Sequence, residues 1–256
     1  MSILVTGGAG YIGSQFLHTA IDAGIQHLVV IDDLSTGSRE AVPENIPFYH
    51  ANVADSELLG RIFIDHEVDT IVHFAGSIIV PESMEHPLKY YKNNTCNSRD
   101  LIEVAVSFNI RHFIFSSTAA VYGNASGKPI TETQTLNPIS PYGLSKLMTE
   151  RMLADVSVAH DLKFVVLRYF NVAGADPLGR TGQRNPGATH LIKRALLACT
   201  GQEDKLSVFG NDYNTPDGSA IRDFINVADL ARAHVAAIEY LRDGGSSDTF
   251  NCGYGK

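Results

Sequence analysis

A glycine-rich turn near the start of the chain constrains the fold more than any other feature. Gly7, Gly10 and Gly13 separate an apolar run at residues 3–6 from residues 11–23, where apolar side chains recur three and four apart. These patterns predict a buried strand followed by a helix. Glycines at such a junction permit a tight turn, close approach of a phosphate to the N–H groups of the helix N-terminus, and close packing of helix on strand. A plain strand-to-helix turn is the simpler alternative.

Two carboxylates favour the ligand-binding interpretation of this turn. The next predicted strand, residues 28–32, ends at Asp32, and Asp33 follows it. A carboxylate in this position can accept hydrogen bonds from the two ribose hydroxyls of an adenosine. Asp32 and Asp33 would repel a 2′-phosphate, and the nearest basic residue that follows is Arg39. The sequence therefore predicts a dinucleotide site that binds NAD rather than NADP.

Strand-like and helix-like segments alternate over the first two thirds of the chain. Apolar runs rich in Val, Ile and Phe predict strands, and apolar residues three and four apart predict helices. The expected strands are residues 3–6, 28–32, 70–74, 112–116 and 163–168, and the expected helices are residues 11–23, 56–66, 97–108 and 143–160. This alternation predicts an α/β fold, with a doubly wound parallel sheet of the Rossmann type between two layers of helices.

The pattern changes after Arg168, where Gly, Pro and Asn become frequent. Such a stretch indicates loops. We therefore expect two domains, with residues 1–170 binding NAD and residues 171–256 forming a smaller substrate-binding lobe. The elements expected in the lobe are a helix at residues 189–200, a strand at 206–209, a helix at 227–241 and a final strand from Thr249.

Charge and composition argue against several kinds of function. The 256 residues carry a formal net charge of -8, whereas a nucleic-acid partner requires clustered Lys and Arg. The ten histidines include no HExxH pattern, so no metal site is expected. Cys96, Cys199 and Cys252 are widely spaced and odd in number, which indicates reduced, structural thiols. Because no apolar window could span a membrane and no leader is recognisable, we expect no membrane partner and a cytoplasmic location.

A tyrosine and a lysine four residues apart open the longest predicted helix. Tyr142 and Lys146 therefore share one helical face, where the ammonium favours the ionised phenol. Such a tyrosine can act as a base near neutral pH, and a positive nicotinamide ring would favour the phenolate further. Upstream, Ser116, Ser117 and Thr118 end a predicted strand at the edge of the sheet where doubly wound folds bind ligands. Each pattern is common by chance, but together they predict oxidation of a substrate hydroxyl.

Seven motifs in a fixed order point to a known family. They are TGGAGYIG at 6–13, HFAG at 73–76, YYKNN at 90–94, FSSTAAVYG at 115–123, SPYGLSK at 140–146, RYFNVAGA at 168–175 and FGNDYNTPDGSAIRDFINVADLA at 209–231. The combination resembles the extended short-chain dehydrogenase/reductase family, and within it the NAD-dependent epimerases of UDP-sugars. The resemblance covers the whole chain. It implies interconversion of UDP-glucose and UDP-galactose by transient oxidation at C4 with a tightly bound NAD, in a homodimer formed through helices like 97–108 and 143–160.

The resemblance also implies site residues. Thr118, Tyr142 and Lys146 would form the catalytic trio, in which Tyr142 takes the proton of the sugar 4-hydroxyl and Thr118 holds that hydroxyl. The cofactor would contact Gly7, Gly10, Tyr11, Ile12, Gly13, Asp32, Asp33, Asn52, Val53, Phe74, Ala75, Gly76, Asn93, Tyr142, Lys146 and Tyr169. The UDP-sugar would contact Thr118, Tyr142, Asn171, His190, Leu191, Phe209 and Arg222.

The residues after Thr118 discriminate between relatives of the same fold. Sugar-nucleotide 4,6-dehydratases carry an acidic pair at the positions of Ala119 and Ala120, and decarboxylating relatives carry a glutamate at the second. Elimination of water needs an acid and a carboxylate base, which alanine cannot supply. An epimerase is therefore expected. Ile78 and His190 replace a lysine and an asparagine found in some members, so UDP-N-acetylglucosamine, UDP-glucuronate or a UDP-pentose stays open as substrate.

Two further departures from the family pattern bear on binding. Asn52 stands where an adenine-binding aspartate is usual, although its amide oxygen can accept the same hydrogen bond. Family members also continue past residues 251–253 into segments that contact the uridine diphosphate, so we expect a truncated member. Such a chain would be an epimerase of impaired substrate affinity, an NAD-binding remnant without turnover, or an NAD-sensing partner protein. The intact trio counts against the last of these.

Overall fold

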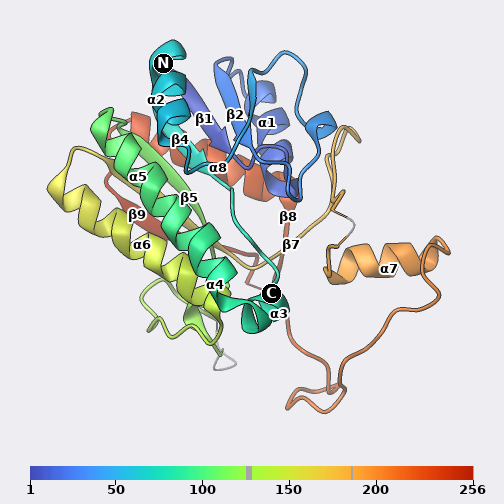
Figure 1. Cartoon of the computed structure of the whole chain (residues 1–256). Helices are drawn as coiled ribbons and strands as arrows, with labels where there is room; N and C mark the ends of the chain where they lie inside the picture. The colour runs from blue at the N-terminus through green and yellow to red at the C-terminus, as the bar shows by residue number, and fades with distance from the viewer. Residues whose placement is uncertain (125–128, 186, 256) are drawn as a thin grey trace.

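A parallel β-sheet forms the centre of the molecule (Figure 1). The structure is a computed structural model, and it describes residues 1–124, 129–185 and 187–255. Within these residues the sheet has seven strands in the order β3-β2-β1-β4-β5-β6-β9, and every neighbouring pair is parallel. The strands are β1 (Ser2–Thr6), β2 (Leu28–Asp32), β3 (Phe48–His50), β4 (Val68–His73), β5 (His112–Thr118), β6 (Lys163–Tyr169) and β9 (Asp248–Cys252). The strand order reverses between β1 and β4, where doubly wound folds bind their ligands.

Helices cover both faces of this sheet, so the predicted fold class is confirmed. One face is covered by α1 (Tyr11–Asp22) and α8 (Val227–Arg242), and the other by α2 (Ser56–Asp65), α5 (Asn97–Ser107) and α6 (Pro141–Ala159). Figure 1 shows α5 and α6 in front of the sheet and α8 behind it. Each face buries its own apolar cluster, with Phe16 and Leu230 in the first and Leu101 and Leu153 in the second. β2 is apolar from Leu28 to Ile31 because both of its faces are buried.

The connection from β4 to α5 contains three short helical segments. They are α3 (Val80–Glu85), α4 (Pro87–Tyr90) and the π-helix η2 (Tyr91–Cys96), which continues directly into α5. A π-helix is rare and occurs most often at functional sites. Here η2 packs against α6. Short 3-10 turns, η1 (Arg39–Ala41) and η3 (Ala119–Tyr122), follow β2 and β5.

The second lobe is small and open. A two-stranded parallel sheet, β7 (Asn171–Ala173) with β8 (Phe224–Asn226), forms its base. The predicted helix at 189–200 is present as α7 (Leu191–Cys199), which projects away from the body in Figure 1. The predicted strand at 206–209 is wrong, because these residues form no strand and Val208 and Phe209 are 79% and 96% exposed.

Both α8 and β9 follow residue 170 but return to the large sheet. α8 packs against α1, and β9 pairs with β6 from Val165–Asp248 to Tyr169–Cys252. The functional division into residues 1–170 and 171–256 stays a prediction. In space, the second lobe consists of the residues between β6 and α8. In the part of the chain that the structure describes, no helix has the length and apolar character needed to cross a membrane. The three cysteines are free, Cys252 buried and the other two exposed.

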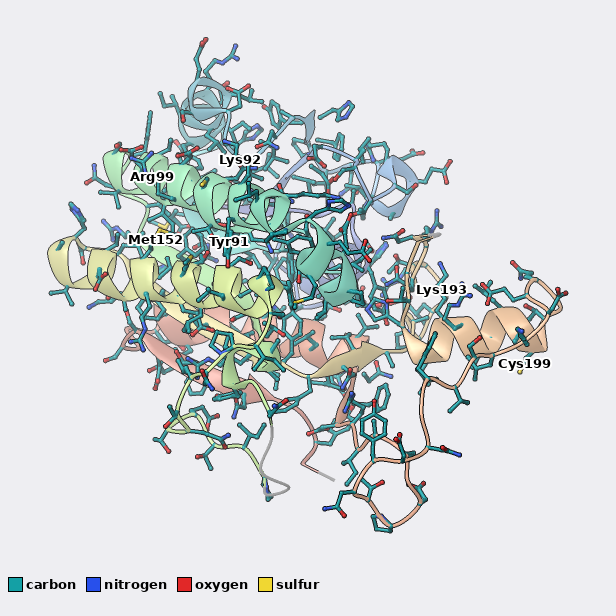
Figure 2. The ribbon with its side chains drawn as sticks, turned by 60° about the horizontal axis from the view of Figure 1, so that its bottom comes forward. Tyr91, Lys92, Arg99, Met152, Lys193 and Cys199 are labelled. Atoms are coloured by element: carbon teal, nitrogen blue, oxygen red, sulfur yellow. The ribbon has the colours of Figure 1, made fainter. Side chains whose placement is uncertain are left out.

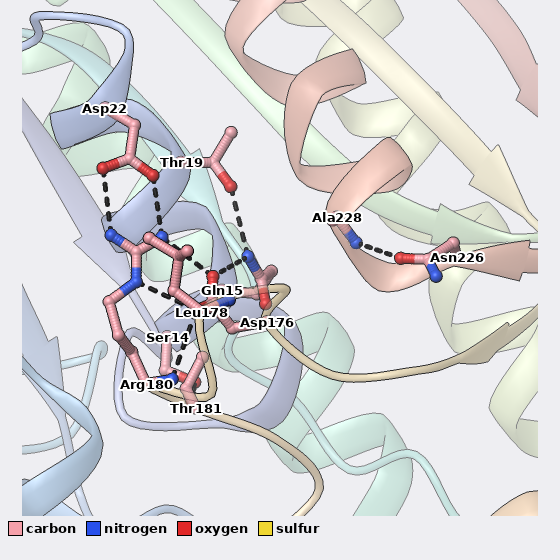
Figure 3. A network of polar contacts seen from close by, with 10 residues as sticks. All are labelled: Ser14, Gln15, Thr19, Asp22, Asp176, Leu178, Arg180, Thr181, Asn226 and Ala228. Carbon is pink, nitrogen blue, oxygen red and sulfur yellow. Dashed lines mark hydrogen bonds and ion pairs between the residues drawn. The ribbon is translucent and has the colours of Figure 1, made fainter.

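A cluster of ion pairs fastens the loop after β7 to α1 (Figure 3). The guanidinium of Arg180 donates to both carboxylate oxygens of Asp22 (2.9 and 2.7 Å) and to both of Asp176 (2.8 and 2.9 Å). Asp176 is buried and also accepts from the Gln15 side chain (3.1 Å). These charge-assisted bonds hold the base of the second lobe against the helix layer.

Candidate active site

A groove of about 2380 Å³ crosses the carboxyl ends of the parallel strands at the switch point. Drug-sized ligands occupy roughly 300–1,000 Å³, so the groove has room for a dinucleotide and a second ligand. The predicted site residues that line it are Gly7, Gly10, Tyr11, Ile12, Gly13, Asp32, Asp33, Asn52, Val53, Phe74, Ala75, Gly76, Asn93, Thr118, Tyr142, Tyr169, Asn171, His190, Leu191 and Arg222.

The glycine-rich turn forms a cradle at one end of the groove. Gly7 adopts a φ of 69°, and a Cβ at Gly13 would lie 2.2 Å from the Gly7 carbonyl oxygen. A side chain at position 13 therefore requires the backbone to move. The helix α1 begins at Tyr11 with no side-chain cap and no acidic residue in its first turn. Its first N–H groups are consequently available to a pyrophosphate.

Asp32 completes this end of the groove. Its carboxylate accepts hydrogen bonds from the backbone N–H groups of Ala9 (2.9 Å) and Leu34 (2.8 Å). Burial raises the pKa of Asp32, and these hydrogen bonds oppose the shift. Each oxygen keeps a further lone pair, which suits the carboxylate to ribose hydroxyls. The cradle, the helix N-terminus and this acceptor together fit NAD.

Two amide side chains predicted at the cofactor are held by local hydrogen bonds. Asn52 Oδ1 accepts from the N–H of Ala54 (2.9 Å), which closes a tight turn around Val53 at the groove wall. Asn93 Nδ2, from the π-helix η2, donates to Ser77 Oγ (2.9 Å) after β4. These bonds orient both side chains, and their roles toward a cofactor stay predictions.

The first turns of α6 carry Tyr142 and Lys146. The side chain of Ser140 caps this helix by accepting from the N–H of Gly143 (3.2 Å), and Pro141 occupies its first position. Both are preferred helix-start residues. The helix therefore begins two residues before the predicted start, and Tyr142 and Lys146 both lie within it.

Tyr142, Lys146 and Thr118 come together at the end of β5. Tyr142 and Lys146 of α6 are both buried, with exposed fractions of 8% and 3%. The Lys146 ammonium donates to the carbonyl of Ser116 (3.0 Å) and lies 4.9 Å from the centre of the Phe115 ring. Lys146 thus sits behind the groove wall, whereas Tyr142 and Thr118 line the groove itself.

Burial perturbs both ionisable groups. It lowers the pKa of Lys146 to about 8, and the Glu150 carboxylate opposes this shift. It raises the pKa of Tyr142, and the neighbouring Thr118 hydroxyl opposes that shift. The phenol is therefore protonated at neutral pH unless positive charge stands beside it. That Lys146, four residues further along the same helix, supplies this charge stays a prediction.

A buried hydrogen-bond chain that the sequence did not predict runs behind this trio. His234 Nδ1 bonds the carbonyl of Leu230 (2.9 Å), and its Nε2 bonds Ser116 Oγ (2.9 Å). Because a carbonyl only accepts, Nδ1 carries the proton and Nε2 accepts from the serine. Burial lowers the pKa of His234 to about 4. Its ring lies 4.7 Å, centre to centre, from that of Phe74, so α8 supports the groove from behind.

Five of the seven residues predicted to bind a UDP-sugar belong to the second lobe, and four of these five line the groove. Asn171 opens β7, and its Nδ2 donates to the carbonyl of Asp223 (2.9 Å). His190 and Leu191 stand at the start of α7, and Arg222 precedes β8. Asn171, His190, Leu191 and Arg222 all line the groove.

Phe209, like Lys146, is a predicted site residue that does not line the groove. Its side chain is 96% exposed, so the geometry gives that prediction no support. Conversely, Ser77, Asn124, Gln183 and Asn251 line the groove without having been predicted. Ser77 directly follows the HFAG motif, which is a usable signal. Asn124 likewise directly follows the FSSTAAVYG motif, whereas Gln183 and Asn251 reach the groove only through tertiary structure.

The fold and the site together define a dinucleotide-dependent protein with a buried Tyr–Lys pair, and a family model agrees with this class. The model of the NAD dependent epimerase/dehydratase family matches residues 3–253. The chain belongs to this family. Its cofactor is NAD, which the residues of the cradle fit.

Three individual UDP-glucose 4-epimerases are similar to this chain over nearly its whole length. The UDP-glucose 4-epimerase of Azospirillum brasilense is 57% identical over 254 residues, which cover 99% of this chain and 73% of that protein. The crystal structure of UDP-glucose 4-epimerase from Brucella ovis in complex with NAD has a TM-score of 0.96 at 44% identity, covering 100% of this chain and 78% of that one. The structure of UDP-glucose 4-epimerase with UDP-glucose from Thermotoga maritima has a TM-score of 0.84 at 36% identity, covering 100% and 78%.

Proposed function

We propose that this chain interconverts UDP-glucose and UDP-galactose by reversible oxidation at C4 of the sugar. The observation that carries the proposal is the buried Tyr142–Lys146 pair beside Thr118, on a groove whose other end holds the cradle for NAD. The 57% identity to a UDP-glucose 4-epimerase supports the same reaction.

The trio has a division of labour that follows from its chemistry. Bound NAD would supply an acceptor and donor of hydride at C4. Tyr142 takes the proton of the 4-hydroxyl as a phenolate and returns it to the same oxygen as a phenol. Lys146 stabilises the phenolate by its charge. Thr118, beside the phenol, holds the substrate hydroxyl. Because C4 would regain the hydride and its oxygen the proton that each had lost, the reaction has no net redox change.

Two alanines favour epimerisation over dehydration. Ala119 and Ala120 line the groove in the 3-10 turn that follows Thr118. A dehydratase needs an acid and a base at the neighbouring sugar carbons, and these positions offer neither. The second half of the groove suits a nucleoside diphosphate, for which Arg222 is a donor of charge-assisted hydrogen bonds.

Turnover of the purified protein tests the proposal. Incubation with UDP-glucose or with UDP-galactose, without added oxidant, should give the same mixture of the two by chromatography, and denaturation should release NAD. Tyr142→Phe should retain NAD and lose at least about 100-fold in kcat. Tyr240→Phe, which changes an exposed tyrosine of α8, is the matched control. A 4-keto-6-deoxy product would contradict the epimerase assignment, and absence of bound NAD would contradict the cofactor site.

We also infer a homodimer and a cytoplasmic location. The outward faces of α5 and α6 are the candidate contact, in the layer where Figure 2 labels Tyr91, Arg99 and Met152. Burying these faces between two copies would form a four-helix contact with two-fold symmetry. Sedimentation of the purified protein at two concentrations measures the oligomeric state.

A further inference from the structure

The end of β5 is fastened to helices on both faces of the sheet. Successive residues of a strand point to opposite faces, and two serines here use both directions. Ser116 bonds His234 of α8, and Ser117 Oγ donates to Glu150 of α6. Thr118 is the next residue along the strand. The polar strand end therefore fixes the position from which Thr118 enters the groove.

Glu150 is a buried carboxylate paired with a buried arginine. The side chains of Glu150 and Arg168 are 6% and 7% exposed. Arg168 Nε donates to both carboxylate oxygens (3.1 and 3.2 Å), and one terminal nitrogen donates to Oε2 (2.6 Å). With Ser117 as a further donor, the carboxylate is held in one orientation. A buried ion pair is seldom more stabilising than an apolar pair of the same size, so stability alone does not account for it.

Glu150 lies on the same helical face as Tyr142 and Lys146. The three residues follow one another at intervals of four, about one helical turn, and all are buried. The Glu150 carboxylate acts to raise the pKa of Lys146, against the burial that lowers it to about 8. The orientation of this carboxylate therefore affects the charge of the neighbouring ammonium.

No other described anion is found to act on Lys146. His73 of β4 is neutral there, because burial lowers its pKa to about 3. Tyr90 of α4 packs edge-on against Tyr142, with ring centres 6.4 Å apart, and burial raises its pKa. Tyr169 of β6 has a raised pKa for the same reason. On the helices that pack against α6, Lys92 of η2 and Arg99 of α5 are exposed (Figure 2).

Arg168 connects this pair to the rim of the groove. Its guanidinium donates to the hydroxyl of Tyr122 (2.9 Å), and that hydroxyl donates to Asn251 Oδ1 (2.7 Å). Asn251 is the penultimate residue of β9 and lines the groove. One polar network therefore joins α6, β5, β6 and β9 beneath the Tyr142–Lys146 pair.

We propose that Glu150 is a positioning residue: clamped by Ser117 and Arg168, it fixes α6 against β5 so that Tyr142 meets Thr118, and it keeps the ammonium of Lys146 charged. The proposal rests on the proposed epimerase function, because it concerns the same site. It extends that function to a residue that touches neither the sugar nor the cofactor.

Three variants separate positioning from mere stability. Glu150→Gln keeps the shape and removes the charge, but it leaves Arg168 buried without a counter-ion, which destabilises the fold. The double variant Glu150→Gln with Arg168→Gln removes both charges together and should therefore stay folded. Asp69→Asn is the control, because it breaks the Arg242–Asp69 pair (2.8 Å) at the amino end of β4. The groove lies at the opposite, carboxyl end of the strands.

The double variant should be slower than the unmodified protein, and its activity should decline at lower pH on the alkaline side. In the double variant kcat should fall about 10-fold to 100-fold, with KM changed less than about 3-fold. The alkaline limb of the kcat profile should move to lower pH by about one unit, because Lys146 loses its proton more readily without Glu150. Asp69→Asn should change neither kcat nor the profile.

A titration that does not depend on turnover completes the test. Ionisation of Tyr142 in the NAD-bound protein is measured by ultraviolet absorbance, as the difference from Tyr142→Phe in the same background. In the double variant the phenolate should form at higher pH, because its cationic neighbour is lost earlier. A loss of kcat with an unchanged pH profile and an unchanged Tyr142 titration would overturn the proposal. An unmodified protein without turnover would overturn the proposed function instead, while the titration still tests Glu150.

Discussion

Replacing Gly13 with alanine should weaken NAD binding while the fold persists. The added Cβ would lie 2.2 Å from the Gly7 carbonyl oxygen and 2.9 Å from Gly8 Cα. Comfortable non-bonded contacts are about 3.5 Å, so α1 and the turn must separate by about 1 Å. Overpacking of this kind costs about 1–3 kcal/mol, and it falls on the turn that cradles the pyrophosphate. Since about 1.4 kcal/mol is tenfold in affinity, the Kd for NAD should rise about 10-fold to 100-fold.

Calorimetric titration of NAD into protein stripped of its cofactor measures this change. Gly182→Ala is the control, because its Cβ would meet only Ala175 Cβ at 3.4 Å, an ordinary contact. Thermal unfolding of both variants reports whether the fold is intact. Equal NAD affinities in the two variants, with equal melting temperatures, would refute the close packing of α1 on the turn as the reason for glycine at position 13.

Two further predictions concern stability. Arg180→Ala should lower the free energy of unfolding in urea by about 2 kcal/mol. Arg180 holds the pKa of Asp176 below its usual range. The stability that Arg180 contributes is therefore present at neutral pH and is lost as the pH falls below the pKa of an unfolded aspartate toward the lower pKa of folded Asp176. A loss of stability in Arg180→Ala that is as large at acid pH as at neutral pH would contradict the Arg180–Asp176 pair as its cause. Burial lowers the pKa of His73 to about 3 and of His234 to about 4, so the unfolded chain binds more protons below about pH 6.5 and stability should fall from there toward pH 4. His234→Gln should make that decline shallower, and an unchanged slope in denaturant titrations would show that the buried ring does not contribute.

Sequence and structure agree where local chemistry determines conformation. The first βα unit is correct because a continuous apolar strand, three glycines and an apolar helix period are all local signals. β2 matches at both ends, since the apolar run stops at Asp32. α6 starts earlier than its apolar period suggests because Ser140 and Pro141 cap it. Capping residues would have corrected that boundary.

Tertiary contacts account for what the sequence did not predict. The run at 206–209 has strand-like residues, but no strand in the described part of the chain pairs with it, and it stays exposed. β7 and β8 are three residues each, too short to show a period. Ser116 and His234 are 118 positions apart, so no local pattern could predict their hydrogen bond. Glu150 differs from these residues, because its four-residue spacing from Lys146 can be read from the sequence alone.

The pairing of β7 with β8 has a consequence for how such a chain can diversify. Three residues of each strand pair, from Asn171–Phe224 to Ala173–Asn226, and α8 begins directly afterwards. The segment between β7 and β8 therefore leaves and re-enters the fold at adjacent points. Outside the ion pairs of Asp176 and Arg180, which hold the segment to α1, we expect its length and composition to vary while the central sheet and its helices are kept. If this segment binds the sugar nucleotide, as proposed above, exchanging it among relatives should alter the sugar-nucleotide preference.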